Sequence, residues 1–427
     1  MTDAVTTAAP PPNPLRAYAA VTAAYWAFML SDGALRMLVL LHFNSLGFTP
    51  IQLAWLFLLY EVAGIVTNLA AGWLAARFGL AATLYGGLAL QIGALVALAQ
   101  LDPSWSVAAS VAFVMAVQGV SGVAKDLAKM SSKSAVKLLA PGEGALFRWV
   151  AALTGSKNAV KGLGFFLGAA LLASVGFTRA IWAMASVLAL ILVAVVLFLP
   201  AGLPGRMKGA DRWSGWRSAD PRVNRLSLAR MFLFGARDTW FVVGIPVYFE
   251  AALSPDGPDA SRAAFFLVGG FMALWVIGYG AVQALAPRLL GGAGQPLADS
   301  VRHAIRWSGL LVPIPLVLAA AAALAGGTAP WLTGLLVGGL MLFGFVFAVT
   351  SSLHSYLILA FGAADRITRD VGFYYMANAA GRLIGTLLSG VSYQLGGLPL
   401  CLASAGLMAA ASWAAAGRLR ADRLPAA

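Results

Sequence analysis

Cysteine and histidine are scarce in this sequence, which has one cysteine, Cys401, and three histidines in 427 residues. A disulfide framework or a cysteine-based metal cluster needs at least two thiols, so the sequence excludes both. The histidines, His42, His303 and His354, are too widely separated to form a local metal-binding motif. We therefore expect neither a metal nor another cofactor.

Charge is also scarce, because only 11% of the residues are charged whereas 60% are hydrophobic. This composition excludes a water-soluble globular fold. Acidic residues are the rarer kind, with 16 Asp and Glu against 29 Lys and Arg and a net charge of +13. In a soluble chain this excess would suggest nucleic acid, but here the positions of the basic residues indicate membrane topology instead.

The start of the sequence lacks the features of a cleaved signal peptide. Residues 1–14 form a tail rich in Ala, Thr and Pro without a basic segment, and the first apolar stretch contains Asp32 and Arg36. We expect this stretch to be retained as a membrane helix. Neither end has a lipidation motif, so we expect the chain to span the membrane rather than to be anchored to it.

Long apolar stretches follow one another along the chain. A bilayer core of about 30 Å requires about 20 apolar residues per helix, and about twelve stretches meet this requirement between clusters of Gly, Pro or charge. The predicted spans are residues 18–42, 51–74, 80–101, 105–128, 146–174, 178–199, 227–251, 264–286, 304–325, 331–360, 371–394 and 398–416. We predict an all-α membrane protein with twelve transmembrane helices in two pseudo-symmetric six-helix bundles.

The longest connection, residues 201–225, divides these helices six and six and is rich in Gly, Arg and Trp. It is predicted to be a cytoplasmic linker between an N-terminal bundle, 18–200, and a C-terminal bundle, 226–417. The remaining residues, 1–17 and 418–427, are predicted cytoplasmic tails.

The distribution of Lys and Arg predicts the orientation. With both termini cytoplasmic, most basic residues fall in cytoplasmic loops and tails, and the opposite loops contain only Arg179 and Arg262. We expect a multi-pass protein of the cell inner (plasma) membrane.

The two halves of the sequence resemble each other. Residues of the first half recur in the second at an offset of about 220, and Asp32 has a counterpart in Asp238. The recurring pairs are Ser131-Ser132 with Ser351-Ser352, Leu139-Ala140 with Leu359-Ala360, Gly142 with Gly362, and Asn158-Ala159 with Asn378-Ala379. A shared offset over a loop and two helices indicates a duplicated unit in parallel orientation. Small-residue spacings, Gly164-x-x-x-Gly168 and Gly381-x-x-x-Gly385, permit close helix packing.

A few charged residues lie near the centres of the spans, where an ionised group costs at least about 2.5 kcal/mol. They are Asp32, Arg36, Glu61, Lys157, Lys161, Arg237, Asp238 and Arg382. The third, sixth, ninth and twelfth spans have no central charge, so we expect them to face lipid while the others surround a polar cavity. This pattern is typical of a two-half carrier that works by alternating access.

Five cations against three acids leave some cations without an acidic partner. Pairing is an alternative, because Asp32 and Arg36 are one turn apart and Arg237 can pair with an acid on a neighbouring helix. A positive cavity binds anions through the fork of Arg and the point charge of Lys. We predict a small polyanion as substrate, bound by Arg36, Lys157, Asn158, Lys161, Arg237 and Arg382.

Buried carboxylates can change charge as their surroundings alternate, so Asp32, Glu61 and Asp238 are candidates for proton coupling. Glu61 is favoured because no cation lies within a turn of its own helix. A pair with Lys157 or Lys161 would remove that distinction.

Four lysines, Lys125, Lys129, Lys133 and Lys137, recur every four residues and predict one basic stripe at the inner end of the fourth span. The stripe is either an anchor on anionic lipid headgroups or an electrostatic funnel at a cytoplasmic entrance. His354, in the tenth span, is either a hydrogen-bonded packing residue or a proton relay.

Residues 72–79, Gly-Trp-Leu-Ala-Ala-Arg-Phe-Gly, resemble the G-x-L-x-D-R-x-G-R-R signature of the major facilitator superfamily. The usual Asp is Ala76, and Leu80 and Ala81 replace the basic pair. More specific are residues 25–37 (YWAFMLSDGALRM), 122–130 (GVAKDLAKM), 153–162 (LTGSKNAVKG) and 229–238 (ARMFLFGARD). Together they resemble the ArsJ-type organoarsenical efflux permeases, over residues 17–417.

This resemblance implies a secondary transporter with the major facilitator fold that exports 1-arseno-3-phosphoglycerate and so confers arsenate resistance, as an antiporter if coupled to protons. It implies a functional partner, the glyceraldehyde-3-phosphate dehydrogenase that makes this ester from arsenate. The ester is a small polyanion, in agreement with the cationic centre. We expect a monomer.

The alternative is a carrier of phosphorylated metabolites or other organic anions. An enzyme acting on lipid phosphates would need a nucleophile and base, or a metal cluster, near one interface. The sequence has no such constellation, so we expect no enzymatic activity. A sensor with a carrier fold would be expected to have a soluble signalling domain.

Overall fold

The computed structural model describes residues 14–78, 80–139, 143–198, 218, 220–254, 257–289, 296–361 and 367–419. Within these ranges, side chains are described except at positions 14, 69, 71–78, 80, 133–139, 143–155, 257–260, 287–289 and 367–369. The signature-like segment 72–79 therefore lies outside the described side chains.

Every regular element of the described residues is a helix, as expected for a chain in lipid, where each backbone N–H and C=O needs a partner within its own segment. The first half contains α1 (Pro14–Ser45), α2 (Pro50–Leu56), α3 (Leu58–Phe78), α4 (Leu80–Leu98), α5 (Val107–Leu139), α6 (Glu143–Val175) and α7 (Phe177–Phe198). The second half contains α8 (Pro221–Thr239), the π-helical turn η1 (Trp240–Gly244), α9 (Ile245–Leu253), α10 (Gly257–Leu289), α11 (Leu297–Leu311), α12 (Pro313–Ala325), α13 (Pro330–Phe361) and α14 (Ile367–Gly417).

These helices make up the twelve predicted spans, because three spans are interrupted and α14 contains two. Helices α2 and α3 form the second span, α8 to α9 the seventh, and α11 and α12 the ninth. Helix α14 breaks at Gly396 and Gly397, between the predicted spans 371–394 and 398–416. Gly397 has a φ of +62°, a conformation that glycine adopts without strain. The predicted all-α fold class is confirmed.

Ten helical stretches of the described residues are long and apolar enough to cross a membrane, and one of them, residues 370–417, holds two spans. Helix α8 is not among them, because it contains four arginines and Asp238. The seventh span is thus the most polar of the bundle. It needs polar neighbours inside the protein.

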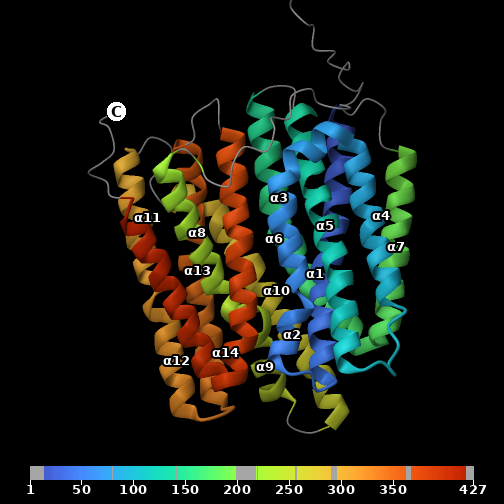
Figure 1. The fold of residues 1–427 in the computed structure, drawn as a ribbon, viewed down its shortest axis with the longest axis vertical. Helices are drawn as coiled ribbons and strands as arrows, with labels where there is room; N and C mark the ends of the chain where they lie inside the picture. The colour runs from blue at the N-terminus through green and yellow to red at the C-terminus, as the bar shows by residue number, and fades with distance from the viewer. Residues whose placement is uncertain are drawn as a thin grey trace, which may run out of the picture.

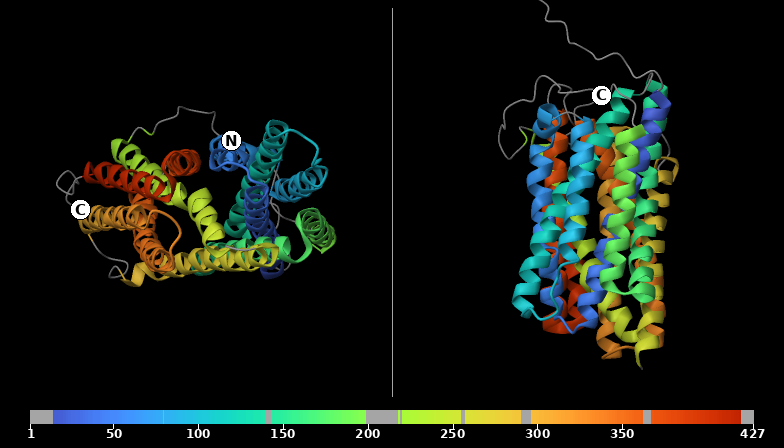
Figure 2. Two further views of the ribbon diagram at one scale, coloured as in Figure 1. Left: turned by 90° about the horizontal axis from the view of Figure 1, so that it is seen from below. Right: turned by 90° about the vertical axis from the view of Figure 1, so that its right-hand side faces the viewer.

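The two halves lie side by side, with α1 to α7 in one and α8 to α14 in the other (Figure 1). The start of α1 and the end of α14 lie at the same end of the bundle, which is at the top of Figure 1. We call this end the termini end and the opposite one the far end. Seen along the helices, α7 and α12 are on the periphery (Figure 2).

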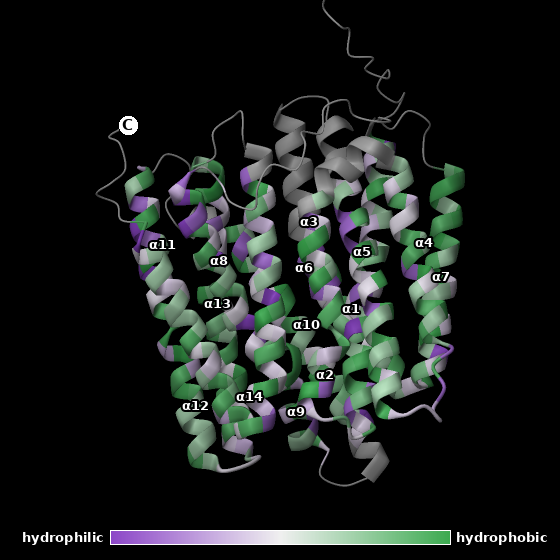
Figure 3. Cartoon of the chain, viewed as in Figure 1, coloured by the Kyte–Doolittle hydropathy of each residue, from purple (hydrophilic) through white to green (hydrophobic). Residues whose placement is uncertain are grey.

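The third, sixth, ninth and twelfth spans present apolar side chains to the outside, as predicted. Hydrophobic residues dominate α4, α7 and α12 (Figure 3). Leucines on three of these spans are largely exposed, namely Leu190 at 71%, Leu324 at 85% and Leu407 at 69%. Apolar outer surfaces of this kind are expected where a helix contacts lipid.

The seventh span is irregular where it meets α14. Pro246 has no backbone N–H, and the π-helical turn η1 precedes it. The hydroxyl of Ser389 on α14 accepts hydrogen bonds from the backbone N–H of Val243 and of Gly244, each at 3.1 Å. The α14 side chain thus satisfies backbone donors of the irregular turn inside the bundle.

Contacts at the far end join the two halves. The Asn44 amide of α1 donates a 2.6 Å hydrogen bond to the carboxylate of Glu250 in α9. The backbone N–H of Ile51 in α2 donates to Gln394 Oε1 of α14 at 3.2 Å. At Gly390 of α14 a side chain would lie 2.6 Å from the carbonyl oxygen of Pro50, so the backbones are in close contact there.

Candidate functional site

The charges predicted at the centres of the spans meet between the two halves. They lie on α1, α3, α6, α8 and α14, and hydrogen bonds connect most of them. These contacts form two groups, Asp32 with Tyr60 and Lys161, and Glu61 with Arg36, Arg382, Asp238 and Arg237. The groups meet where the guanidinium carbon of Arg36 lies 5.5 Å from the centre of the Tyr60 ring, and together we call them the central network. Residues far apart in sequence thus become neighbours in the middle of the bundle.

Asp32 is buried, with 2% of its surface exposed, and both carboxylate oxygens have partners. Lys161 Nζ donates to Asp32 Oδ2 at 2.9 Å, and Tyr60 Oη donates to Oδ1 at 2.5 Å. The alternative in which Asp32 and Arg36 neutralise each other is therefore wrong. Although Arg36 lies one turn from Asp32 on α1, it pairs with Glu61 of α3 instead.

Glu61, 1% exposed, binds two arginines through one oxygen. Oε1 accepts a 3.2 Å hydrogen bond from Arg36 Nη1 and a 2.6 Å bond from Arg382 Nη2. Sequence analysis favoured Glu61 for proton coupling because its own helix has no cation within a turn. Other helices supply two cations, so this reason does not distinguish Glu61 from Asp32 and Asp238. The partners of Glu61 are arginines of α1 and α14 and not the predicted Lys157 or Lys161.

Asp238 pairs with two arginines, Arg237 and Arg382. Arg237 Nε donates to Asp238 Oδ1 at 2.5 Å. Arg382 Nε lies 3.4 Å from Asp238 Oδ2, within ion-pairing distance but without hydrogen-bond alignment. Arg237 therefore pairs with its neighbour in sequence rather than with an acid of another helix.

Two ion pairs of the central network join corresponding spans of the two halves. Asp32 and Lys161 connect the first span to the fifth. Asp238 and Arg382 connect the seventh span to the eleventh. The counterpart predicted between Asp32 and Asp238 thus extends to the cations that they bind.

Glycines bring these helix pairs together. A side chain at Gly164 on α6 would lie 2.5 Å from the carbonyl oxygen of Leu30 on α1. One at Gly385 on α14 would lie 2.6 Å from the carbonyl oxygen of Gly235 on α8. The predicted small-residue spacings therefore allow backbone contact in both halves, between the helices that carry these two ion pairs.

Lys125 lies inside the protein and not on a surface stripe. It is 8% exposed, and its Nζ is 3.9 Å from the centre of the Tyr60 ring. A spacing of four residues places lysines on one face of α5, but it does not tell what covers that face. Here α3 covers it, so the prediction of a lipid-headgroup anchor or funnel is wrong for Lys125, which adjoins the central network.

Lys129 is held by polar groups of its own half. Its Nζ donates to Asp126 Oδ1 at 3.1 Å and to Asn68 Oδ1 at 3.0 Å. Lys133 and Lys137 belong to α5, but their side chains lie outside the described residues. Their role as a basic entrance stays a prediction.

Asn158, one of the predicted binding residues, is buried between the halves. Its amide Nδ2 donates to Gln283 Oε1 at 3.1 Å, and Tyr279 Oη donates to its Oδ1 at 3.2 Å. Both partners belong to α10 of the other half. Lys157 precedes it on α6 and is half-buried.

Sequence reasoning missed Arg230, which is 5% exposed in α8. It lies near the start of the predicted span 227–251, where basic residues are ordinarily explained by topology. The available signal is its spacing of seven residues from Arg237, because seven residues are two turns and place both on one helix face. Nη1 of Arg230 donates to Ser351 on α13, to the carbonyl oxygen at 2.9 Å and to the hydroxyl at 2.8 Å.

His354 lies on α13 and is completely buried. Neither ring nitrogen has a hydrogen-bond partner among the described residues. The prediction of a hydrogen-bonded packing residue is therefore wrong in its hydrogen bonding. A proton relay stays a prediction.

Several guanidinium donors of the site are buried without an acceptor. Within the described part of the chain these include Arg36 Nη2, Arg230 Nε and Arg382 Nε. Most buried polar atoms in proteins are hydrogen-bonded, so these three donors can each bind a further acceptor. Arginine donors suit phosphate or carboxylate oxygens.

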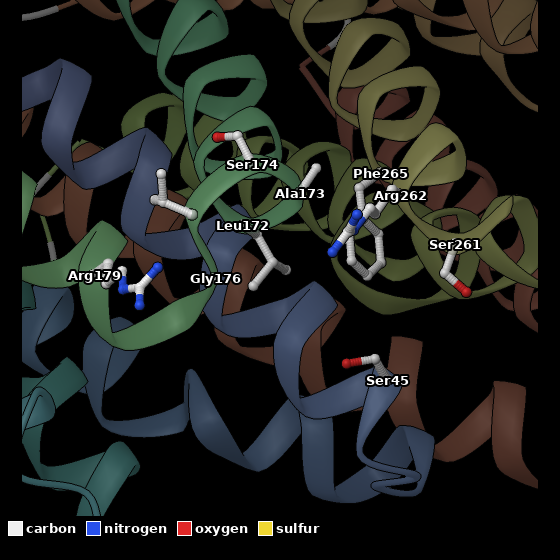
Figure 4. A pocket seen from close by; sticks show the side chains of 10 residues that line it. Ser45, Leu172, Ala173, Ser174, Gly176, Arg179, Ser261, Arg262 and Phe265 are labelled. Carbon is white, nitrogen blue, oxygen red and sulfur yellow. The ribbon is translucent and has the colours of Figure 1, made fainter. Parts of the chain in front are cut away.

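A separate pocket of about 490 Å³ opens at the far end, between α1, α6, α7 and α10 (Figure 4). Arg179 and Arg262, the two basic residues predicted for the far loops, both line it. Along α6 it begins at Leu172, about 16 Å beyond Lys161 at the rise of an α-helix. It is therefore distinct from the central network.

Comparison with known proteins agrees with this architecture. A mutant of the nucleoside transporter NupG has a TM-score of 0.68 and 15% identity, covering 94% of this chain and 98% of that chain. The human organic anion transporter MFSD10 has a TM-score of 0.61 and 18% identity, covering 95% of this chain and 100% of that chain. No curated protein matches the sequence.

At these identities the two solved structures establish the fold alone. The family model of the Major Facilitator Superfamily matches residues 21–386, which is most of the chain and includes the whole central network. With twelve spans in two similar halves around this network, the chain belongs to the Major Facilitator Superfamily.

Proposed function

We propose that this protein is a secondary active transporter that exports a small organic polyanion by alternating access. The observation that carries the proposal is the set of buried guanidinium donors without acceptors, on Arg36, Arg230 and Arg382. They lie on α1, α8 and α14, so both halves contribute. An anion bound there contacts both halves and can favour one arrangement of the halves over another.

The balance of charge supports an anion rather than a neutral or cationic substrate. Carboxylates pair with Arg36, Lys161, Arg237 and Arg382. Arg230 and Lys125 are buried with no carboxylate of the described residues within 4 Å. Positive charge in excess of buried acid is costly in a membrane protein, and an anionic ligand offsets that cost.

The proposed substrate is 1-arseno-3-phosphoglycerate, which would make this protein an arsenate-resistance permease of the inner membrane. The support comes from four motifs that resemble the ArsJ-type permeases, at residues 25–37, 122–130, 153–162 and 229–238. They contain the central cations of α1, α6 and α8. The functional partner is then a glyceraldehyde-3-phosphate dehydrogenase, which supplies the ester.

Proton coupling by Asp32, Glu61 or Asp238 is part of this proposal. Each carboxylate is bound to a basic side chain that a substrate anion would compete for. When the anion takes the cation, the released carboxylate is left in a medium that disfavours its charge, and it binds a proton. Binding of the anion and binding of the proton are thereby linked at one site, so transport of the anion depends on the proton gradient.

The second candidate is a carrier of phosphorylated metabolites or other organic anions. It is favoured by the same cations, and one solved structure of similar fold is described as an organic anion transporter. The two candidates differ only in selectivity.

Arsenic accumulation by everted membrane vesicles tests the proposal. The vesicles receive arsenate, glyceraldehyde 3-phosphate, NAD and the dehydrogenase, and each component is omitted in turn. We expect accumulation to require every component and to disappear when the proton gradient is collapsed. Uptake of free arsenate, or of 3-phosphoglycerate alone, would instead indicate a general anion carrier.

A further inference from the structure

Arg230 differs from the arginines of the central network in its surroundings. Arg36, Arg237 and Arg382 each lie within ion-pairing distance of a carboxylate. Arg230 is 5% exposed, and in the described part of the chain its hydrogen-bond acceptors are two oxygens of Ser351. Its charge is therefore buried without an ion-pairing carboxylate from the described residues.

The surroundings of Arg230 hold its guanidinium in place. The guanidinium carbon lies 4.2 Å from the ring centre of Phe234 and 5.0 Å from that of Tyr374. Nη1 is bound to Ser351, while Nε has no partner. Aromatic faces stabilise the cation without accepting its N–H groups in the strong way that an oxygen does. The group is thus oriented and incompletely bonded.

His354 provides a second, independent sign of a ligand. It follows Ser351 by one turn of α13, is 0% exposed, and has two ring nitrogens without partners. Ser351 in turn binds Arg230, so one turn of α13 separates His354 from a partner of that arginine. A neutral imidazole has one donor and one acceptor, and both are normally bonded when buried. Arg230 and His354 therefore both have unfilled polar atoms, and Ser351 lies between them along the contact of α8 with α13.

We propose that Arg230, Ser351 and His354 form a second anion subsite, which binds one acidic group of an organic dianion while the central network binds the other. This inference rests on the proposed export of an organic polyanion and narrows its chemical class. The substrate class is an organic acid with two separated acidic groups, such as a phosphorylated carboxylate.

The spacing along α8 suits such a ligand. Arg230 and Arg237 are seven residues apart, which is two turns on one face and about 10 Å along the axis. Side chains of this length can converge on two acidic groups joined by a short carbon chain. A single phosphate engages only one of the two sites.

A chain of hydrogen bonds connects the proposed subsite to the other half. Gln283 Nε2 on α10 donates to Ser351 Oγ at 3.0 Å. The other end of that amide, Gln283 Oε1, accepts from Asn158 Nδ2 on α6 at 3.1 Å. A group bound at Arg230 and Ser351 therefore acts on a contact between the halves, which move relative to each other in alternating access.

Ligand binding to the purified full-length protein tests the subsite, with tryptophan fluorescence as the readout. The probes are 3-phosphoglycerate, which has two acidic groups, and glycerol 3-phosphate, which has one. Arg230→Gln is compared with Arg230→Lys and with Arg225→Gln, a control at the termini end of the same helix, where Arg225 contacts the carbonyl of Arg418.

We expect Arg230→Gln to weaken binding of 3-phosphoglycerate by at least about tenfold, as for loss of a charge-assisted hydrogen bond. Binding of glycerol 3-phosphate should change less than about twofold, because the central network holds its single phosphate. Arg230→Lys should lie between the wild type and Arg230→Gln, since it retains the charge and loses the fork. Arg225→Gln should behave as the wild type.

Equal weakening for both probes, or none for either, would overturn the subsite and leave the proposed transport intact. A wild-type protein that binds neither probe would also overturn the subsite, whereas the vesicle assay decides the proposed function separately. If Arg230→Gln does not fold, Arg230→Lys and Ser351→Ala permit the same comparison. An unchanged ratio of the two affinities in both of these variants would overturn the subsite.

Discussion

Glu61 illustrates how single side chains set the charge balance of the site. One oxygen of this carboxylate binds arginines of α1 and α14, which belong to different halves. Arginine does not lose its proton in proteins, so both cations need a counter-charge whenever they are buried away from water. An incoming anion can supply that counter-charge in place of Glu61. Glu61 is therefore both a contact between the halves and a candidate for proton uptake.

The pair of Asp32 and Lys161 permits a double-mutant test. We expect Asp32→Asn to lower the free energy of unfolding by about 3–5 kcal/mol, because it leaves a buried cation unpaired. Adding Lys161→Gln should restore most of that loss without restoring transport. Thermal unfolding in one detergent measures both variants, and Asp102→Asn, in an exposed loop, is the control. Losses that simply add would show that the two side chains are not coupled.

The cations of the site have a predicted role in binding. Single Ala variants of Lys157, Lys161, Arg237 and Arg382 should abolish export while the protein still inserts, because deleting a charge from a span lowers the cost of insertion. Export is measured in everted vesicles and divided by the amount of protein in the membrane. Normal export by all four variants would refute the assignment of the site.

At the scale of the helices, the internal repeat explains why two ion pairs join corresponding spans of the two halves. Contact between α1 and α6 and between α8 and α14 is possible because glycines line both interfaces. Backbone approach of this kind lets short carboxylates reach cations across the interface. Packing and charge are therefore determined together in each half.

Gly168 tests this coupling of packing and charge. A methyl group there would overlap the backbone of Ala34 on α1, so we expect Gly168→Ala to push α6 from α1 and to destabilise by about 1–3 kcal/mol. Separation of Asp32 from Lys161 should also reduce transport. Gly93→Ala on α4 is the matched control, because a side chain there meets nothing within 4 Å. Equal behaviour of the two variants in melting and transport assays would rule out the coupling.

At the scale of the whole molecule, the halves are joined at the far end through α1 with α9 and through α2 with α14. Alternating access requires these contacts to separate during each cycle. They comprise these two hydrogen bonds and the close approach of Gly390 to Pro50.

A reversible cross-link at the far end should stop the cycle. We expect Asn44→Cys with Glu250→Cys, bridged by a short bifunctional thiol reagent, to lose transport and to regain it on reduction. The native Cys401 is buried and should not react. Each single cysteine variant treated with the same reagent is the control. Undiminished transport after complete cross-linking would show that these positions do not separate.

Much of this architecture follows from composition and order along the chain. The apolar background makes each central charge conspicuous, because an ion in a membrane span requires a partner or a ligand. Twelve spans, the repeat, and the central residues such as Asp32, Glu61 and Arg382 could all be predicted in this way. The hydropathy of a segment depends only on its own residues, so a single sequence is enough to predict the membrane spans.

Pairing was decided only in three dimensions. Glu61 and Arg382 are separated by 321 residues, and no local pattern distinguishes that partner from Lys157 or Lys161. Lys125 belongs by its four-residue spacing to a predicted surface stripe of lysines, but α3 covers it. Arg230 resembles a boundary residue in sequence and is buried, because α13 and α14 pack over it. Electrostatic partners depend on which helix faces meet, and that is a property of the packed bundle.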